Sequence, residues 1–533
     1  MKDRLLKFWA LLMVVGISAA VVYFVQRECG GEFIYPLDDS YIHLAMAKNL
    51  ARYGVWGIEP ERMAFCSSSP FWTLLLAASV RILPEIAEFL PLILSAILGV
   101  GVLWMVDGVL GRLDTPPLVR FAATSVFCLV VPIPVIGVLG MEHALHSLMI
   151  VSAMYCALQS SAPRYFVGAC CFAFAATATR YESLFLLLPL SFMAALSMKD
   201  GSGNGIRRYI LRVFAFSLSA VFPVVVYGVW AVVHGGYWLP NSLLLKGHFY
   251  TFVDLVESMF MVFTCIPKGT EHIYALWGVL LMVIFLRGTP LRFRLAATAL
   301  VVALWGQCVL AAISPDGRYE AWLMAGGFFC TLGALAAGRF DLRPILFSCD
   351  KVKARRVGWL LFAMLVMVMV CRGGALIINT PKRCHDIYAQ QVQMTRMMAS
   401  LPQGEKGTIA LNDLGYMALY SGAKVFDIWG LGSQDAARAR ICADRGWLKE
   451  DIDRLFKENN VQYMLLFGKW FPEAMLPAGT ILVAVLDTPG NTTCGQDSVN
   501  FLACDRIHAD YLKEHLSHFV SNTYPGSKLI LMY

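Results

Sequence analysis

The sequence predicts a polytopic α-helical membrane protein that carries a small α/β domain at its C-terminus. Of its 533 residues, 58% are hydrophobic and 15% are charged, whereas a soluble globular protein is about 25% charged. The hydrophobic residues gather in runs of roughly 20, long enough to cross a hydrocarbon core of about 30 Å. Such runs stop near Thr380, and residues 382–533 are soluble in composition. We therefore predict a membrane domain over residues 1–380 and an extracytoplasmic domain over residues 381–533.

The first hydrophobic run lies at the N-terminus and resembles the start of a signal peptide. The basic segment Met1–Lys7 precedes the apolar run 8–25. No small-residue cleavage site is clear, so we interpret the run as a retained span with its N-terminus in the cytoplasm. With this span, about eleven crossings are predicted. They are 8–25, 89–110, 118–138, 142–159, 164–179, 182–198, 209–233, 270–286, 293–313, 321–337 and 357–377.

One apolar segment, 70–83, is predicted to lie at the outer membrane interface and not to cross. Ser69-Pro70 is typical of a helix start, the run is short, and Arg81 interrupts it. Counting 70–83 as a crossing would place the strongest basic clusters outside, against the cytoplasmic preference of Lys and Arg. The net charge of +7 is therefore a topology signal, and nothing in its distribution indicates nucleic-acid binding.

A pair of carboxylates, Asp38-Asp39, lies in the first outside loop, 26–88. Residues 40–53 have a helical pattern, and Gly54 is a typical stop. One interpretation makes Asp39 the N-cap of this helix and Asp38 its solvated neighbour. The other makes one of them a general base, assisted or not by a divalent cation (Mg, Mn or Ca), because a low-dielectric surface raises a carboxyl pKa. The residues alone favour neither. Since Asp39 lies nearer the helix start, Asp38 is the preferred base and Asp39 the preferred cap.

Other polar residues fall on the same predicted side of the membrane. Glu142 and His143 stand at the mouth of a span, where an acidic residue also stabilises a helix N-terminus. Together with the Asp pair, Glu142 becomes a candidate second carboxylate of a site.

Three cations on the predicted outer side are candidates for binding a phosphate. Arg180, Lys246 and Arg318 run against the cytoplasmic preference of basic residues. Arg offers phosphate a fork of donors, and Lys offers a point charge. Two other interpretations stay open: a local ion pair between Arg180 and Glu182, and snorkelling of the long side chains.

The C-terminal region alternates strand and helix patterns, which predicts a small α/β domain. A helical stretch is expected at 390–401 and a helix at 449–459, with strands at 407–411, 424–428, 463–467 and 481–486. Asn412-Asp413 and Asp427 each follow a strand, where ordinary turn chemistry is favoured over ligand binding.

The fifteen cysteines show no spacing typical of a metal site. Cys29 and Cys66 could bridge across the first outside loop, and Cys494 and Cys504 could bridge in the C-terminal domain. Spacing alone proves neither disulfide.

Several of these stretches together resemble the GT-C superfamily of integral-membrane glycosyltransferases, in particular the branch of bacterial proteins related to terminal arabinofuranosyltransferases. The resemblance spans nearly the whole chain. The matching stretches in the membrane domain are Asp38-Asp39-Ser40-Tyr41-Ile42, Ser69-Pro70-Phe71-Trp72-Thr73, Gly140-Met141-Glu142, Thr179-Arg180-Tyr181-Glu182, Leu239-Pro240-Asn241-Ser242 with Lys246, and Arg318-Tyr319-Glu320. Those in the C-terminal domain are Leu411-Asn412-Asp413-Leu414-Gly415 and Asp427-Ile428-Trp429-Gly430-Leu431. One departure is Tyr181, which stands where the branch usually has proline.

The resemblance implies a bacterial cytoplasmic-membrane enzyme that takes a sugar from a polyprenyl-phosphate donor at the extracytoplasmic face. The acceptor would be a cell-envelope glycan or lipid. An Asp of the first outside loop would act as base in an inverting displacement or would position a metal ion. Further candidates for acceptor binding or support of the site are Tyr41, His43, His143, Glu182, Asn241, Tyr319 and Glu320.

Two other functional classes remain open at this level. A transporter or flippase of lipid-linked sugars would need intramembrane polar residues along a path, and usually inverted repeats. The sequence shows neither, since its polar groups gather at one face. A noncatalytic subunit of envelope assembly would use the Asp pair only to cap a helix.

Overall fold

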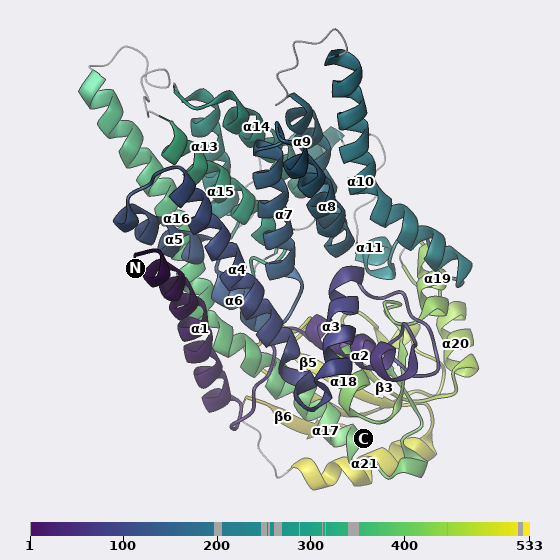
Figure 1. The fold of residues 1–533 in the computed structure, drawn as a ribbon. Coiled ribbons are helices and arrows are strands. Elements are labelled where there is room, and N and C mark those ends of the chain that lie inside the picture. Colours follow the sequence, from purple (N-terminus) through teal and green to yellow (C-terminus); the bar gives the residue numbers. More distant parts are fainter. Residues whose placement is uncertain are drawn as a thin grey trace.

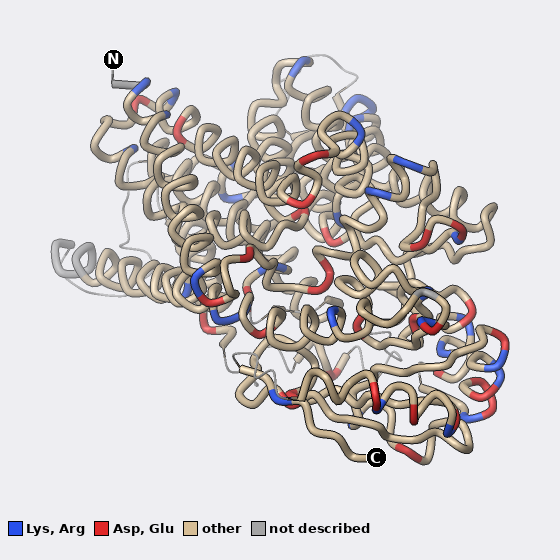
Figure 2. Tube along the Cα trace, turned by 90° about the horizontal axis from the view of Figure 1, so that it is seen from below, with Lys and Arg blue, Asp and Glu red and all other residues tan. Residues whose placement is uncertain are grey.

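The structure is a computed structural model that describes residues 2–196, 205–246, 253, 256–260, 269–286, 288–311, 313–314, 316–338, 351–444, 446–520 and 526–533. Figure 1 shows a bundle of helices with a smaller domain at one end. Charged residues are sparse along the bundle helices and dense on the smaller domain (Figure 2). The predicted fold class, a polytopic helical membrane protein with a small C-terminal α/β domain, is confirmed.

The apolar helices of the bundle stand where the sequence predicts them. They are α1 (Lys2–Glu28), α4 (Leu90–Arg112), α5 (Pro117–Val130), α6 (Ile133–Leu139), α7 (His143–Leu158), α8 (Pro163–Thr179), α9 (Leu184–Leu196), α10 (Gly205–Val233), α13 (Glu271–Phe285), α14 (Leu291–Leu310), α15 (Ala321–Ala337) and α16 (Lys351–Ile387). In the described part of the chain, five helices are long and apolar enough to cross a membrane by themselves. Several others are shorter apolar helices of 10–17 residues. The ends of the predicted spans 182–198 and 293–313 include residues outside the described ranges.

One predicted span, 118–138, is broken into two helices. Helix α5 ends at Val130 and α6 begins at Ile133, with a bend of 41° between them. Pro132 lies at the break, and a proline lacks the N–H that continues a helix. After this break, Gly140 and Glu142 follow α6 and lie near the loop 26–88.

Helix α16 joins the bundle to the smaller domain without interruption. It runs from Lys351 to Ile387 and continues through a π-helical turn, Tyr388–Val392, into α17 (Gln393–Ala399). The predicted domain boundary at 380/381 therefore lies inside a continuous helix. Figure 1 shows α16 reaching from the far end of the bundle to the C-terminal domain.

The C-terminal domain is built on one mixed six-stranded sheet in the order β2-β1-β3-β5-β4-β6. Strand β1 pairs in parallel with β2 and β3, and the remaining pairs are antiparallel. The strands are β1 (Thr408–Leu411), β2 (Lys424–Asp427), β3 (Val461–Leu466), β4 (Ile481–Asp487), β5 (Ser498–Ala503) and β6 (Lys528–Leu531). The helices are α18 (Gly415–Tyr420), α19 (Gln434–Cys442), α20 (Lys449–Glu458) and α21 (Arg506–Val520). The sequence predicts β1 to β4 and α20, and it misses β5, β6, α18, α19 and α21.

Two helices of the loop 26–88 lie between the bundle and the sheet. They are α2 (Asp38–Tyr53), which ends at the left-handed Gly54 as predicted, and α3 (Pro70–Ile82). At 13 residues, α3 is about 20 Å long and too short to cross a bilayer. Side chains of α2, α10 and the C-terminal domain share one buried hydrophobic cluster, which includes Met46, Tyr227 and Met417. This packing brings the loop 26–88, the bundle and the sheet together at one place.

Candidate functional site

The two carboxylates of Asp38 and Asp39 point to different partners. Asp39 Oδ2 accepts a hydrogen bond from Arg318 Nη1 at 2.8 Å, and Asp39 Oδ1 lies 3.6 Å from Lys246 Nζ. Asp38 instead accepts hydrogen bonds from the backbone N–H groups of Gly415 and Tyr416, at 2.5 and 2.9 Å. Successive residues of a helix diverge by about 100°, so neighbours cannot share one face. Asp38 and Asp39 therefore do not act together at one site, because their carboxylates contact different partners.

The expectation that Asp39 caps its own helix is wrong. Helix α2 begins at Asp38, its N-cap is Leu37, and no side chain makes the capping hydrogen bond. Asp38 instead caps α18 of the C-terminal domain, where the free N–H groups of a helix start attract an anion. Gly415 allows the close approach, because a Cβ there would lie 2.2 Å from the Asp38 carbonyl oxygen.

The surroundings move the pKa values of the two carboxyl groups in opposite directions. Burial raises the pKa of Asp38 to about 6, against the opposing effect of the two N–H donors of α18. Burial also acts to raise the pKa of Asp39, but the positive charges of Lys246 and Arg318 outweigh it and hold that pKa below its usual range.

Glu142 is fully buried and bound to Arg180, whose Nη1 donates to Glu142 Oε1 at 2.6 Å. Arg180 Nη2 donates to Glu182 Oε1, also at 2.6 Å. His43 lies beside Glu142, with 3.6 Å between Nε2 and Oε2. The ion pair expected between Arg180 and Glu182 is thus present. All three guanidinium nitrogens of Arg180 donate to Glu142 or Glu182, so Arg180 is less available to a phosphate than Arg318, which donates to Asp39 from Nη1, or Lys246.

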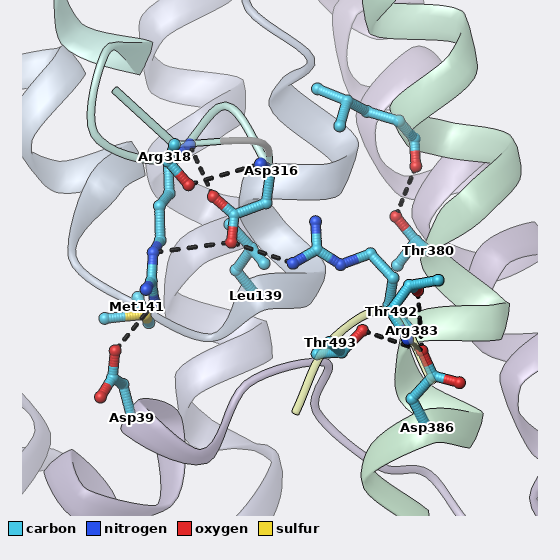
Figure 3. Close-up of polar contacts among 12 residues, drawn as sticks. Asp39, Leu139, Met141, Asp316, Arg318, Thr380, Arg383, Asp386, Thr492 and Thr493 are labelled. Atoms are coloured by element: carbon cyan, nitrogen blue, oxygen red, sulfur yellow. Dashed lines mark hydrogen bonds and ion pairs between the residues drawn. The ribbon is translucent and has the colours of Figure 1, made fainter. Parts of the chain in front are cut away.

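Arg318 belongs to the connection between α14 and α15. Its Nε lies 3.5 Å from Asp316 Oδ2, and Asp316 Oδ2 also accepts a hydrogen bond from Arg383 Nη2 of α16 at 3.0 Å. Figure 3 shows Asp39, Arg318, Asp316 and Arg383 in one chain of contacts. The guanidinium of Arg318 therefore lies between two carboxylates, one from α2 and one from its own loop.

A cavity of about 360 Å³ opens beside Asp39. Predicted site residues that line it are Asp39, His43, Arg180, Glu182, Lys246 and Tyr319. The rest of the lining is mostly apolar and includes Phe185 of α9, Val224 of α10, Leu243 of α11 (Asn241–Lys246), Leu310 at the end of α14, and Leu239 just before α11. Charged side chains of both signs and apolar side chains of the helices thus line the same cavity.

The other predicted site residues have mainly structural contacts. Tyr41 Oη accepts a hydrogen bond from the Tyr35 N–H at 2.9 Å. Asn241 donates to the carbonyl oxygens of Gly430 and Leu431, each at 3.2 Å, and so ties α11 to the C-terminal domain. Glu320 accepts from His272 Nε2 at 2.9 Å and pairs with Arg372 at 3.3 Å. His143 is buried at the start of α7.

Comparison with solved structures assigns this architecture to a known fold. The chain matches ArnT from Cupriavidus metallidurans in the apo state with a TM-score of 0.51 and 12% sequence identity, over 93% of this chain and 98% of that one. It matches ArnT bound to undecaprenyl phosphate with a TM-score of 0.52 and 11% identity, over the same shares. The chain has the GT-C membrane fold of ArnT.

Comparisons at the sequence level identify no family of known function. Residues 385–503 match a family model described as a domain of unknown function, DUF8728. No curated protein matches the chain. The matched residues begin near the end of α16 and cover most of the sheet. The family model therefore covers most of the C-terminal domain and does not cover the helical bundle.

The candidate metal site at Asp38 and Asp39 does not fit the geometry. A divalent cation needs several oxygen ligands on one point. Asp38 is turned to α18, and Asp39 already faces two cationic side chains. Within the described residues, the group with metal-ligand geometry is Cys504, Asp505 and His508 of the C-terminal domain, far along the chain from the Asp pair.

Two further sequence interpretations concern the C-terminal domain and the cysteines. Asp427 accepts backbone N–H groups of Trp429 and Gly432 at 2.8 and 2.7 Å, which confirms the turn interpretation. Both candidate disulfides are wrong, because Cys29, Cys66, Cys494 and Cys504 are all free cysteines.

Sequence reasoning missed Asp316 and Arg383 as members of the site. Asp316 occurs in a Pro-Asp-Gly sequence typical of a turn. Arg383 lies three residues beyond the predicted domain boundary. The one available signal was the charge of Asp316, two residues before a candidate phosphate-binding arginine.

Proposed function

We propose that this protein is a membrane glycosyltransferase that moves a sugar from a polyprenyl-phosphate donor to a hydroxyl of a cell-envelope glycan or lipid at the extracytoplasmic face. The observation that carries the proposal is the placement of Asp39 between Arg318 and Lys246 at the wall of a cavity whose other walls are apolar bundle helices. A carboxylate supplies a base, two cations supply a phosphate site, and the apolar wall suits a lipid.

The donor phosphate would bind to Arg318 and Lys246. These side chains lie against the same carboxylate, and Lys246 keeps 42% of its side chain exposed. Charge-assisted bonds from Arg and Lys to phosphate are among the stronger hydrogen bonds in proteins. The polyprenyl chain would follow the apolar wall toward the membrane. An ArnT structure of the same fold holds undecaprenyl phosphate, which supports a donor of this class.

Asp39, and not Asp38, is the better candidate for the base. The acceptor hydroxyl oxygen would form a bond to the anomeric carbon while the bond from that carbon to the phosphate oxygen breaks. The hydroxyl proton passes to Asp39, and the phosphate leaves with the bonding electron pair, so the anomeric centre inverts. Because the leaving group is a phosphate, no strong general acid is required.

Donor binding would also make Asp39 a stronger base. Without donor, the charges of Lys246 and Arg318 lower the pKa of Asp39. A phosphate that shares these charges would weaken their effect on the carboxylate, so its proton affinity would rise once the donor is in place. Proton abstraction from the acceptor is then favoured only beside a loaded donor.

The test is sugar transfer by the purified protein in detergent, with a panel of radiolabelled polyprenyl-phosphate sugars and acceptor extracted from the cell envelope. Asp39→Asn should abolish transfer, and Lys246→Met should weaken binding of undecaprenyl phosphate about tenfold. Glu88→Gln, a matched carboxylate change on the exposed surface, should leave both unchanged. Transfer retained by Asp39→Asn would refute the assigned base. Movement of the donor across vesicles without transfer would favour a flippase.

A further inference from the structure

We propose that Asp316 is a positioning residue that holds the guanidinium of Arg318 at the donor-phosphate site, and that Arg383 of α16 holds Asp316 in turn. This inference rests on the proposed function of Arg318. Asp316 contacts Arg318, and Arg383 contacts Asp316, so both would act through Arg318 and not on the substrate.

The contacts of Asp316 divide between its two carboxylate oxygens. Oδ1 accepts the backbone N–H of Arg318 at 3.4 Å, which is a local turn contact. Oδ2 lies 3.5 Å from Arg318 Nε and accepts a hydrogen bond from Arg383 Nη2 at 3.0 Å. The side chain of Asp316 is only 4% exposed. The turn uses Oδ1 alone. The contacts of Oδ2 with Arg318 and Arg383 are not part of the turn, so they have a separate role.

The charge on Asp316 opposes the attraction of Arg318 to Asp39. Arg318 Nη1 is 2.8 Å from Asp39, while its Nε faces Asp316. With Asp316 neutral, Asp39 would be the main anion beside this guanidinium. A long arginine side chain held by one carboxylate keeps much more rotational freedom than one held by two. Two opposed carboxylates thus fix the guanidinium at a definite distance from both, where an incoming phosphate can meet it.

Arg383 supplies a second cationic partner for the buried carboxylate of Asp316. A buried carboxylate without a partner is costly, and a paired one is tolerated. Arg383 comes from the part of α16 that enters the C-terminal domain, and three residues later Asp386 accepts a hydrogen bond from Thr492 Oγ1 at 2.8 Å (Figure 3). The contacts that hold Arg318 therefore end on α16, the helix that joins the two domains.

The test measures binding of undecaprenyl phosphate to the full-length protein in detergent, and the donor KM where transfer is observed. Asp316→Asn keeps a turn acceptor and removes the charge, so a purely local role predicts no change. We expect affinity to fall about tenfold, since a displacement of about 1 Å at a binding group can cost more than that. Arg383→Gln should give a loss of similar size.

Two comparisons separate positioning from general damage. In an Arg318→Ala background, Asp316→Asn should cause no further loss, because the group it positions is gone. Arg396→Gln removes the charge of an arginine of α17 that pairs with Glu32 and not with Asp316, and should bind as the wild type does. Wild-type affinity in Asp316→Asn, or an equal loss in the Arg318→Ala background, would overturn the inference. If the wild type binds undecaprenyl phosphate but transfers no sugar, the proposed function fails while the positioning role can still be measured.

Discussion

Arg318 places its guanidinium 2.8 Å from the carboxylate of Asp39, although 279 positions separate the two residues in the sequence. The contact joins the loop 26–88 to the connection between α14 and α15. It also explains why Asp39 stays ionised in a partly buried position, since burial by itself would raise the pKa of its carboxyl group. The proposed base and the proposed phosphate site are thus in direct electrostatic contact.

The first prediction concerns the pH dependence of transfer by an Arg318→Gln variant. Asp39 must be ionised to accept a proton, and Arg318 and Lys246 together lower its pKa. Removing the guanidinium removes part of that effect, so the pKa of Asp39 rises. The acid limb of the profile of kcat/KM against pH, which reports the free enzyme, should therefore move to higher pH. Since the pKa of Asp39 in the wild type lies below its usual range, initial rates are measured from the most acid pH at which the protein stays folded up to neutral pH, and the rate of Arg318→Gln should fall at a higher pH than that of the wild type.

A control for this profile is Lys48→Met, which removes a cation of α2 that pairs with Glu88 and not with Asp39. Its acid limb should coincide with that of the wild type. An Arg318→Gln profile with reduced rates but an unmoved acid limb would mean that Asp39 is not the group that titrates.

The second prediction concerns stability and Asp38. The pKa of Asp38 is raised to about 6 in the folded protein, against about 3.9 in an unfolded chain. The folded state thus binds this proton more tightly, so the contribution of Asp38 favours folding at low pH and is lost as the pH rises through about 6. At most, this amounts to about 3 kcal/mol.

Asp38→Asn removes the titrating group, so the fall in melting temperature between pH 4.5 and pH 7 should be smaller than in the wild type. Thermal unfolding in detergent measures it. Asp413 and Asp427 also have raised pKa values, and a residual slope is therefore expected. Glu88→Gln, at an exposed carboxylate, serves as a comparison and should keep the slope of the wild type. A slope unchanged by Asp38→Asn would show that Asp38 is already ionised at low pH in the folded protein.

The sequence was a good guide to the helices and to the side chains that carry charge. Runs such as 89–110 and 321–337 are read directly from hydropathy because a span must be apolar along its whole length. The short α3 was distinguished from a crossing by Arg81 and by the charge of later loops. Strands β5 and β6 were missed because polar residues interrupt their apolar pattern and their pairing depends on distant partners. Strand β5 lies inside the sheet between β3 and β4, and β6 lies at its edge.

The division of labour between Asp38 and Asp39 was beyond the sequence. Both precede the same helical pattern, and only the arrival of α18 from nearly 380 residues away decides which carboxylate is occupied by backbone N–H groups. The same holds for Arg180, Lys246 and Arg318. All three were candidates for phosphate, and Glu142 and Glu182 occupy the first of them.

The third prediction concerns the buried ion pair of Glu142 and Arg180. Glu142 is fully buried, and its Oε1 is 2.6 Å from Arg180 Nη1. Glu142→Gln removes one of two carboxylates that balance Arg180, and breaking a buried pair in this way typically costs about 3 kcal/mol or more. Arg180→Met alone should be at least as destabilising, because it leaves the buried Glu142 without its arginine and also removes the partner of Glu182, whose side chain is 13% exposed.

The double variant Glu142→Gln/Arg180→Met removes both members of the buried pair at once. The fall in its melting temperature in detergent should therefore be smaller than the sum of the falls in the two single variants, whereas additive falls would mean that the pair contributes no coupling. Glu88→Gln changes an exposed carboxylate paired with Lys48 and should lower the melting temperature by less than any of these variants.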